Sequence, residues 1–168
     1  MSSLILGVDP GSRITGFGLV RVQRGQLIHV THGVIVMTVD GEFAQRMLEL
    51  GGAFRELIEK YRPDQVSIEK IFLGKNADSA FKLGHARGVI MYESMRGGAK
   101  VHEYATRIVK KSVVGNGGAT KEQVQAVLKS LLRLPKIEYL DSSDALAMAC
   151  HHAFELQKQQ LLRRAVEL

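Results

Sequence analysis

The sequence predicts an α/β protein built on a mixed five-stranded sheet that is covered by helices. Two observations support this fold class: three β-rich segments come first, and helical and strand-like segments alternate after them. The first three strands are expected at residues 4–9, 15–22 and 27–36. A Pro-Gly-Ser turn separates the first two, and an Arg-Gly-Gln turn is typical of a hairpin between the second and third. This order favours three neighbouring antiparallel strands.

The pattern then changes to helices separated by short strands. Apolar residues recur at three- and four-residue steps over residues 42–61, and a second long helix is expected at residues 77–96. Thr120 and Gln123 have the spacing of a capping box at the start of another helix. The remaining elements are strands at residues 65–69 and 100–104 and a last helix from about residue 142 to residue 161.

Length and composition indicate one globular domain. The chain has 168 residues, and no repeat, low-complexity segment or Pro-rich linker divides it. No apolar run approaches the roughly 20 residues that span a bilayer, so we expect no membrane association. The first residues lack a basic stretch followed by an apolar segment, which argues against a secretory signal. Cys150 is the single cysteine, which fits a reducing compartment and a core position.

The charge balance favours a polyanionic partner. The formal net charge is +6 and the pI is about 9.6, and a pI above roughly 9 is common among nucleic-acid binders. The positive residues lie in short clusters, such as Arg107 with Lys110 and Lys111, and form no long tail. We therefore expect a folded surface to bind the polyanion.

Four acidic residues lie at positions that are typical of catalytic or metal-binding side chains. Asp9 and Glu69 each follow an apolar strand, a position where rigid backbone fixes a side chain that loops leave accessible. Asp141 and Asp144 are three residues apart at the start of the last helix and can share one helical face. If that helix crosses the sheet near the two strand ends, the four carboxylates converge.

Such a cluster requires cations, and its oxygen-only ligands suit Mg²⁺ or Mn²⁺. Two ions about 4 Å apart could activate a water and stabilise the leaving oxygen of a phosphodiester. Each acid also has a purely structural interpretation. Asp9 could form a turn before Pro-Gly, and Asp141 or Asp144 could cap a helix. Glu69 is the hardest to explain in that way, because an acid that closes an apolar strand has no evident structural role.

Several segments in this order resemble the RuvC family of bacterial Holliday-junction resolvases over nearly the whole chain. The segments that carry the resemblance are Gly7-Val8-Asp9-Pro10-Gly11-Ser12-Arg13-Ile14-Thr15-Gly16, Ile68-Glu69-Lys70-Ile71-Phe72, Lys75-Asn76-Ala77-Asp78-Ser79-Ala80, Leu83-Gly84-His85-Ala86-Arg87-Gly88, Val113-Val114-Gly115, Lys121-Glu122-Gln123-Val124 and Asp141-Ser142-Ser143-Asp144-Ala145-Leu146-Ala147.

The resemblance implies a ribonuclease H-like fold, a homodimer and Mg²⁺-dependent paired nicking of four-way DNA junctions in recombination and repair. It also implies a bacterial cytoplasmic location and work beside the branch-migration proteins RuvA and RuvB. The family's catalytic, metal-binding acids map onto Asp9, Glu69, Asp141 and Asp144, and its functional lysines onto Lys110 and Lys121. Relatives more often have two alanines where this chain has Ser142-Ser143, and some have histidine at the position of Asp141.

Further residues are expected to contact DNA. Phe72 lies in a basic segment just after Glu69, flanked by Lys70 and Lys75, and an aromatic ring there could stack on an unpaired base. Its alternative is a place in the core. Arg13 and Lys111 complete the predicted phosphate-binding set together with Lys110 and Lys121.

The helix at residues 77–96 offers a candidate dimer surface. Ala80, Gly84 and Gly88 recur every four residues, and small side chains at that spacing allow another helix to approach closely. Two glycines inside a helix cost about 1 kcal/mol each relative to alanine, so a packing reason is expected. The alternative is that this stripe packs on the protein's own sheet.

Other functions share parts of this pattern. The segment around Asp9 is similar to the phosphate loop of actin- and sugar-kinase-type ATPases, but those proteins need a second phosphate loop and an adenosine-binding segment that this length does not accommodate. A related nuclease family acts on ribosomal RNA precursors and tends to lack the region of Phe72. A junction-binding module without cleavage is the third alternative, and the presence of all four acids argues against it.

Overall fold

The computed structural model describes residues 2–38, 41–70 and 77–166. Its five strands form one sheet in the order β3-β2-β1-β4-β5. Strands β1, β2 and β3 are antiparallel neighbours, whereas β4 and β5 run parallel to β1. The expected mixed five-stranded sheet is therefore confirmed. The strands are β1 (Ser2–Asp9), β2 (Ile14–Gln23), β3 (Gln26–Val36), β4 (Gln65–Glu69) and β5 (Lys100–Tyr104).

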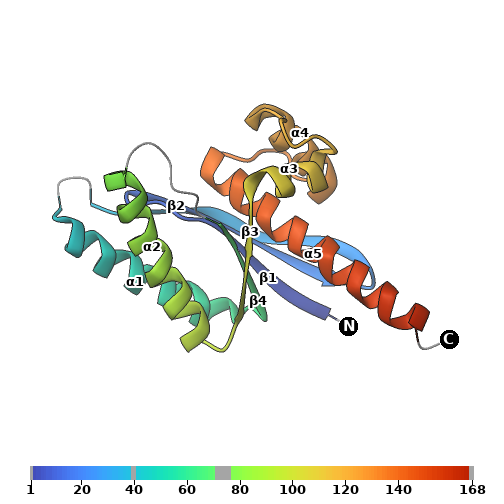
Figure 1. The fold of residues 1–168 in the computed structure, drawn as a ribbon, viewed down its shortest axis with the longest axis horizontal. Coiled ribbons are helices and arrows are strands. Elements are labelled where there is room, and N and C mark those ends of the chain that lie inside the picture. Colours follow the sequence, from blue (N-terminus) through green and yellow to red (C-terminus); the bar gives the residue numbers. More distant parts are fainter. Residues whose placement is uncertain (1, 39–40, 71–76, 167–168) are drawn as a thin grey trace.

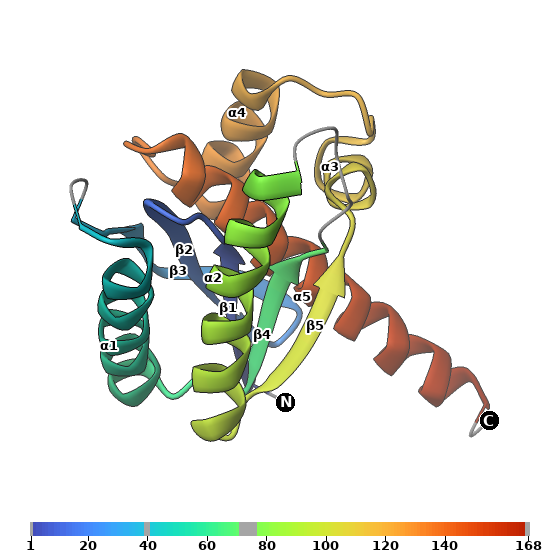
Figure 2. The same cartoon turned by 60° about the vertical axis from the view of Figure 1, so that its left-hand side comes forward.

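Helices cover both faces of this sheet (Figure 1). Helices α1 (Phe43–Tyr61) and α2 (Ala77–Arg96) lie side by side on one face. On the other face, α5 (Leu140–Val166) crosses the strands diagonally, and α3 (Thr106–Val114) and α4 (Lys121–Leu132) pack beside its first half. The last turns of α5 extend away from the sheet, as Figure 2 shows. None of the helices in the described residues is long and apolar enough to cross a membrane.

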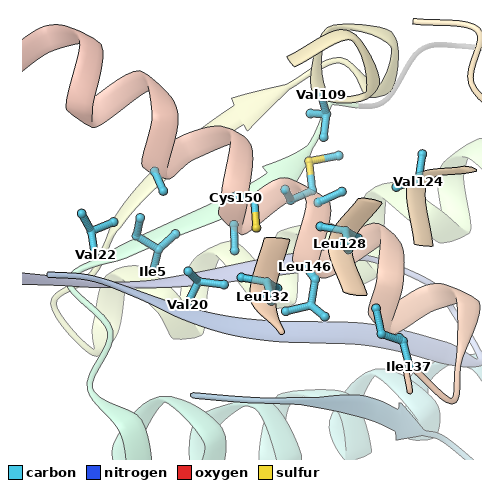
Figure 3. Close-up of a cluster of buried hydrophobic side chains, with 14 of the residues drawn as sticks. Ile5, Val20, Val22, Val109, Val124, Leu128, Leu132, Ile137, Leu146 and Cys150 are labelled. Carbon is cyan, nitrogen blue, oxygen red and sulfur yellow. The ribbon is translucent and has the colours of Figure 1, made fainter. Parts of the chain in front are cut away.

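The two faces of the sheet have separate cores, because successive strand residues point to opposite sides. Leu4, Leu6 and Val8 of β1 pack with α1 and α2, whereas Ile5 of β1 packs with α5. Figure 3 shows the α5-side cluster, in which Cys150 is fully buried as expected. The same alternation places the side chain of Asp9 on the α5 side of the sheet.

Three glycines let α5 approach the sheet closely. A Cβ atom on Gly7 would lie 1.9 Å from the carbonyl oxygen of Ala145, a main-chain atom of α5. A Cβ on Gly16 would lie 2.1 Å from the carbonyl oxygen of Asp141, and one on Gly18 would meet Leu146 at 2.7 Å. Any side chain at these positions would push the helix away, so the glycines set the height at which the acids of α5 stand above the strands.

Most predicted elements are confirmed to within two residues at each end, and two larger differences stand out. The last helix begins two residues earlier and ends five residues later than expected, because its exposed final turns continue past the sheet. Helix α3 is missing from the sequence prediction. It has nine residues and begins after Ala105, which provides no capping side chain, so neither length nor a cap signals it. The capping box of Thr120 and Gln123 is present.

Candidate active site

The predicted acids gather where β1, β4 and α5 meet. The register pairs Val8 with Ile68, so Asp9 and Glu69 come next, side by side, at the carboxyl ends of two parallel strands. Asp141 and Asp144 lie in the first two turns of α5. A cavity of about 240 Å³ opens between these elements, and its lining residues are Asp9, Glu69, Thr106, Val109, Lys110, Lys121, Val124, Asp144, Ala147 and Met148. Three of the four predicted acids therefore line one cavity.

Asp9 does not act as the turn former that its Pro-Gly neighbours suggested. The turn is held by Thr15, whose hydroxyl group donates to the carbonyl oxygen of Gly11 and accepts from the Gly11 amide. Since Thr15 supplies these hydrogen bonds, the carboxylate of Asp9 remains directed to the cavity.

The carboxylates form one electrostatic unit. The pKa of Asp9 is raised from 3.8 to about 8, first because burial disfavours its charged form and then because Asp144, Glu69 and Asp141 repel it. Lys121 opposes this rise. Asp141 thus acts on Asp9 although it is absent from the cavity lining. The structure brings the four acids together electrostatically, with Asp141 at the margin of the group.

Among the described residues, two side chains contact the carboxylates of these acids directly. The ammonium group of Lys121 lies 2.8 Å from a carboxylate oxygen of Asp144, and this hydrogen bond raises the pKa of the lysine. The hydroxyl group of Thr106, the first residue of α3, donates to the carboxylate of Glu69. Thr106 was not among the predicted site residues. It could not be found from the sequence, because α3 itself was not predicted.

The two predicted functional lysines both reach the cavity. Lys121 does so from the first turn of α4, and Lys110 from α3, where its ammonium group donates to the carbonyl oxygen of Ala119 at 3.0 Å. Two positive side chains therefore face three carboxylates across a small space. This arrangement can place a phosphate group between cations and a carboxylate-bound metal.

Three of the other predicted DNA-binding residues fall within the described part of the chain. Arg13, Lys70 and Lys111 are exposed and do not line the cavity. Phe72 and Lys75 fall outside the described residues. The roles of these five residues in DNA binding remain predictions.

The donor set at the cavity fits a divalent cation. The oxygen donors that line it are the carboxylates and the Thr106 hydroxyl, and such oxygen ligands suit Mg²⁺ or Mn²⁺. A cation would also relieve the repulsion that contributes to the raised pKa of Asp9. In the described part of the chain, no three His, Cys, Asp or Glu side chains lie close enough together to hold a metal ion as they stand. Lys121 and Thr106 occupy oxygens of Asp144 and Glu69 instead. A metal ion held by these carboxylates would require Lys121 and Thr106 to change partners.

Comparison with known proteins identifies the family. Residues 5–152 match the family model described as crossover junction endodeoxyribonuclease RuvC. The chain belongs to the RuvC family. The protein of that name from Bdellovibrio bacteriovorus is 70% identical over 168 residues, which cover 100% of both chains. The RuvC protein of Geobacter sulfurreducens is 46% identical over 159 residues, covering 95% of this chain and 97% of the other.

Solved RuvC structures have the same fold. The RuvC of Thermus thermophilus in complex with a Holliday junction substrate has a TM-score of 0.87 and 26% identity, covering 94% of this chain and 96% of that one. The yeast mitochondrial Holliday junction resolvase Ydc2 has a TM-score of 0.62 at 12% identity, which shows a likeness of fold alone. The ribonuclease H-like architecture expected from the resemblance is confirmed, and the ATPase interpretation is not supported.

Proposed function

We propose that this RuvC protein resolves four-way DNA junctions by metal-dependent, paired nicks in two strands. The observation that carries the proposal is the cavity in which Asp9, Glu69 and Asp144, from three separate elements, face Lys110 and Lys121. The relatives are named crossover junction endodeoxyribonucleases, and the similar Thermus protein was solved with a Holliday junction substrate.

Asp9, Glu69 and Asp144 would hold Mg²⁺ or Mn²⁺, with Asp141 as an outer member of the set. When bound, such ions activate a water for attack on the phosphodiester and stabilise the leaving oxygen. The four carboxylates supply the negative charge that attracts the ions, and their rigid strand and helix positions limit how far each oxygen can move. The raised pKa of Asp9 implies that a cation displaces a proton from this group near neutral pH.

The lysines at the cavity would bind the scissile phosphate. Lys121 now neutralises Asp144 at 2.8 Å, and a metal ion that takes over this carboxylate would free its ammonium group for the DNA backbone. Lys110 is held over the same cavity by the carbonyl oxygen of Ala119. The exposed Arg13, Lys70 and Lys111, with Phe72 and Lys75 from the segment after Glu69, would extend this contact over the junction.

Paired nicks require two chains, since the described residues of each chain form one such cavity, and a two-fold dimer is the default. Gly84 and Gly88 of α2 are exposed, and a Cβ at either position would meet no atom of the described chain within 4 Å. Gly84 and Gly88 therefore do not pack on the protein's own sheet.

The neighbouring surface is apolar and hollowed. A groove of about 430 Å³ runs between α1 and α2 and is lined by Met47, Leu48, Gly51, Gly52, Arg55, Gly88, Val89, Tyr92 and Glu93. Leu48, Phe81 and Tyr92 are each about two-thirds exposed, at 70%, 66% and 65%. We propose that a second copy of the chain covers this face. Association with RuvA and RuvB in the bacterial cytoplasm belongs to the same proposal and rests on the family resemblance.

The decisive experiment incubates the purified protein with a synthetic four-way junction, with and without Mg²⁺, beside a linear duplex of the same sequence. We expect symmetric nicks in two strands of the junction, only with the metal, and none in the duplex. Asp9→Asn should bind the junction and not cut it, because it keeps the positive surface and loses a metal ligand. Cleavage by Asp9→Asn in Mg²⁺ at the wild-type rate would exclude the proposed metal site.

A further inference from the structure

We propose that Arg87 of α2 is a positioning residue for Glu69, which it holds through the main chain at the end of β4. The inference deepens the proposed function, since it assigns a role in building the metal site. Arg87 lies in the Leu-Gly-His-Ala-Arg-Gly segment of the sequence, whose glycines belong to the candidate dimer surface while Arg87 itself has no role there.

The contact is direct and largely shielded from solvent. Nε of Arg87 donates to the carbonyl oxygen of Glu69 at 2.9 Å. Nη2 of the same guanidinium lies 2.5 Å from a carboxylate oxygen of Glu103 on β5, an ion pair without hydrogen-bond geometry. The side chain of Arg87 is 16% exposed, and that of Glu103 is 37% exposed. One guanidinium thus connects α2 to the last residue of β4 and to β5.

The carbonyl group of Glu69 lacks the donor that a sheet neighbour would normally supply. The amide of Lys70 donates to Tyr104 on β5, and because the peptide is planar and trans, the Glu69 carbonyl of the same peptide unit points the other way, towards β1. The register of Val8 with Ile68 puts Pro10 at the position from which β1 would donate. Proline has no N–H group. Arg87 supplies the missing hydrogen bond.

The geometry separates this role from that of a metal ligand. Side chains alternate along β4, with Ile68 in the core beneath α1 and α2 and the Ser67 hydroxyl bonded to Met148 of α5. The Glu69 carboxylate lies on the α5 side and contacts Thr106 there, whereas Arg87 comes from α2. Arg87 therefore binds the main-chain carbonyl of Glu69 from the α2 side of the sheet, while the Glu69 carboxylate lies at the cavity on the α5 side.

This position makes the carboxylate sensitive to Arg87. Strand β4 has five residues, and Glu69 is its last, so pairing with β1 ends there. Without the Arg87 hydrogen bond the main chain at Glu69 can fray, and the carboxylate oxygens spread over more positions. Metal affinity then falls, because ligands must be held close to their productive geometry.

Metal binding provides the test. Mn²⁺ or Ca²⁺ binding to the DNA-free protein is measured by calorimetry and by metal-induced thermal stabilisation for wild type, Arg87→Gln, Arg87→Lys and Glu103→Gln. We expect Arg87→Gln to weaken metal binding about tenfold, in the range found for residues that orient metal ligands. It should raise the Mg²⁺ concentration for half-maximal junction cleavage by the same factor and leave junction binding in a metal chelator unchanged.

The other two variants separate positioning from general stability. Glu103→Gln removes the ion pair and keeps the hydrogen bond to Glu69, so its metal affinity should stay within about threefold of wild type. Arg87→Lys keeps a positive charge near Glu103 without the planar donor set, and its affinity should fall between those of wild type and Arg87→Gln. If Arg87→Gln does not fold, the metal affinity of Arg87→Lys is compared with that of wild type instead.

The proposal is overturned if both Arg87 variants bind metal as tightly as wild type while their melting temperatures fall, since Arg87 would then be only a structural anchor. It is also overturned if Glu103→Gln weakens metal binding as much as Arg87→Gln. If wild type binds metal but cuts no junction, the proposed function fails, and the order of the metal affinities still decides the role of Arg87.

Discussion

The two faces of the sheet are built in opposite ways. On the α5 face, Gly7, Gly16 and Gly18 remove side chains so that a helix main chain rests almost on the strands. On the α1–α2 face, large side chains such as Leu6 and Phe54 fill the space between sheet and helices. Gly52 of α1 and Gly84 and Gly88 of α2 point outward instead, and a Cβ at any of the three would meet nothing within 4 Å.

The difference follows from where the chemistry lies. Asp141 and Asp144 must stand at a fixed height above Asp9 and Glu69, and contact between main chains fixes that height more tightly than flexible side chains do. The other face carries no site carboxylate, so ordinary side-chain packing is sufficient there and its exposed surface is free for a partner. Glycines therefore have different roles on the two faces. On the α5 face they allow close packing within the chain, and on the α1–α2 face they leave an open surface.

Gly7→Ala tests the close approach and should have the largest effect on stability. The new Cβ would lie 1.9 Å from the carbonyl oxygen of Ala145 and 2.6 Å from the amide nitrogen of Ala149, and these atoms can move only if α5 moves. Overpacking of this kind costs about 3 kcal/mol, which lowers the melting temperature by roughly 10 °C. Junction cleavage should fall too, because α5 carries Asp144. Melting unchanged from wild type would show that α5 is not seated as described.

Gly84→Leu tests the outward-facing glycines of α2. Since nothing in the described chain lies near Gly84, the variant should keep the circular dichroism spectrum and melting curve of a folded protein. Light scattering should give the mass of a monomer, and paired cuts should be lost. Ser130→Leu places the same side chain at an exposed position of α4 and should remain a dimer. If Gly84→Leu unfolds, the stripe is buried within the chain; if it stays a dimer, the interface lies elsewhere.

Asp9→Asn tests how strongly burial and the neighbouring carboxylates disfavour the charged form of Asp9 on the α5 face. The folded pKa of Asp9 is about 8 against 3.8 for the free group. Between these values the unfolded chain has released the proton and the folded chain still holds it, so the stability of the wild type falls as pH rises through this window. Asn at this position has no such titration. In a metal chelator, the melting temperature of Asp9→Asn minus that of wild type should grow by several degrees from pH 5 to pH 8.

Added metal supplies the control for this measurement. Mg²⁺ at pH 8 should stabilise the wild type more than Asp9→Asn and so reduce the difference, because the cation replaces the proton at Asp9. A difference that does not change with pH would mean that Asp9 is already charged in the metal-free protein.

Gly52→Ala should give the smallest change, and its sign is opposite to that of Gly7→Ala. Gly52 lies within α1, and a Cβ there meets nothing within 4 Å. Alanine in a helix interior is more favourable than glycine by about 0.5–1 kcal/mol, so the melting temperature should rise by about 1–4 °C. This groove belongs to the face proposed for the second copy, so a decrease that depends on protein concentration would place Gly52 inside that contact.

Much of the fold follows from local patterns in the sequence. The bounds expected for β4, α2 and β5 coincide with those in the structure, because turn residues and Gly or Pro mark their ends. Asp9 and Glu69 could be selected for the same reason: an acid that closes an apolar strand is visible in the sequence itself. Helix α3 was missed because nine residues without a cap give no comparable signal.

Contacts between residues that are far apart along the chain could not be predicted without the tertiary structure. Sequence periodicity indicates that a helix has a buried face but not which strand end that face covers. The contacts of Thr106 and Arg87 with Glu69, 37 and 18 residues away, therefore emerge only when α3 and α2 are placed on the sheet. For the same reason, the sequence could not show whether Ala80, Gly84 and Gly88 of α2 face the protein's own sheet or the solvent.

The order of the elements and the residue types that can bind a metal follow from the sequence alone, since hydrophobic period and side-chain chemistry are local properties. The fold had to be known before Asp144 could be placed at the cavity with Asp9, and Asp141 at its margin, and before Gly84 and Gly88 could be seen to face outward. Such choices depend on how closely and at what angle α5 and α2 pack on the strands, which is fixed by contacts between residues far apart in the chain.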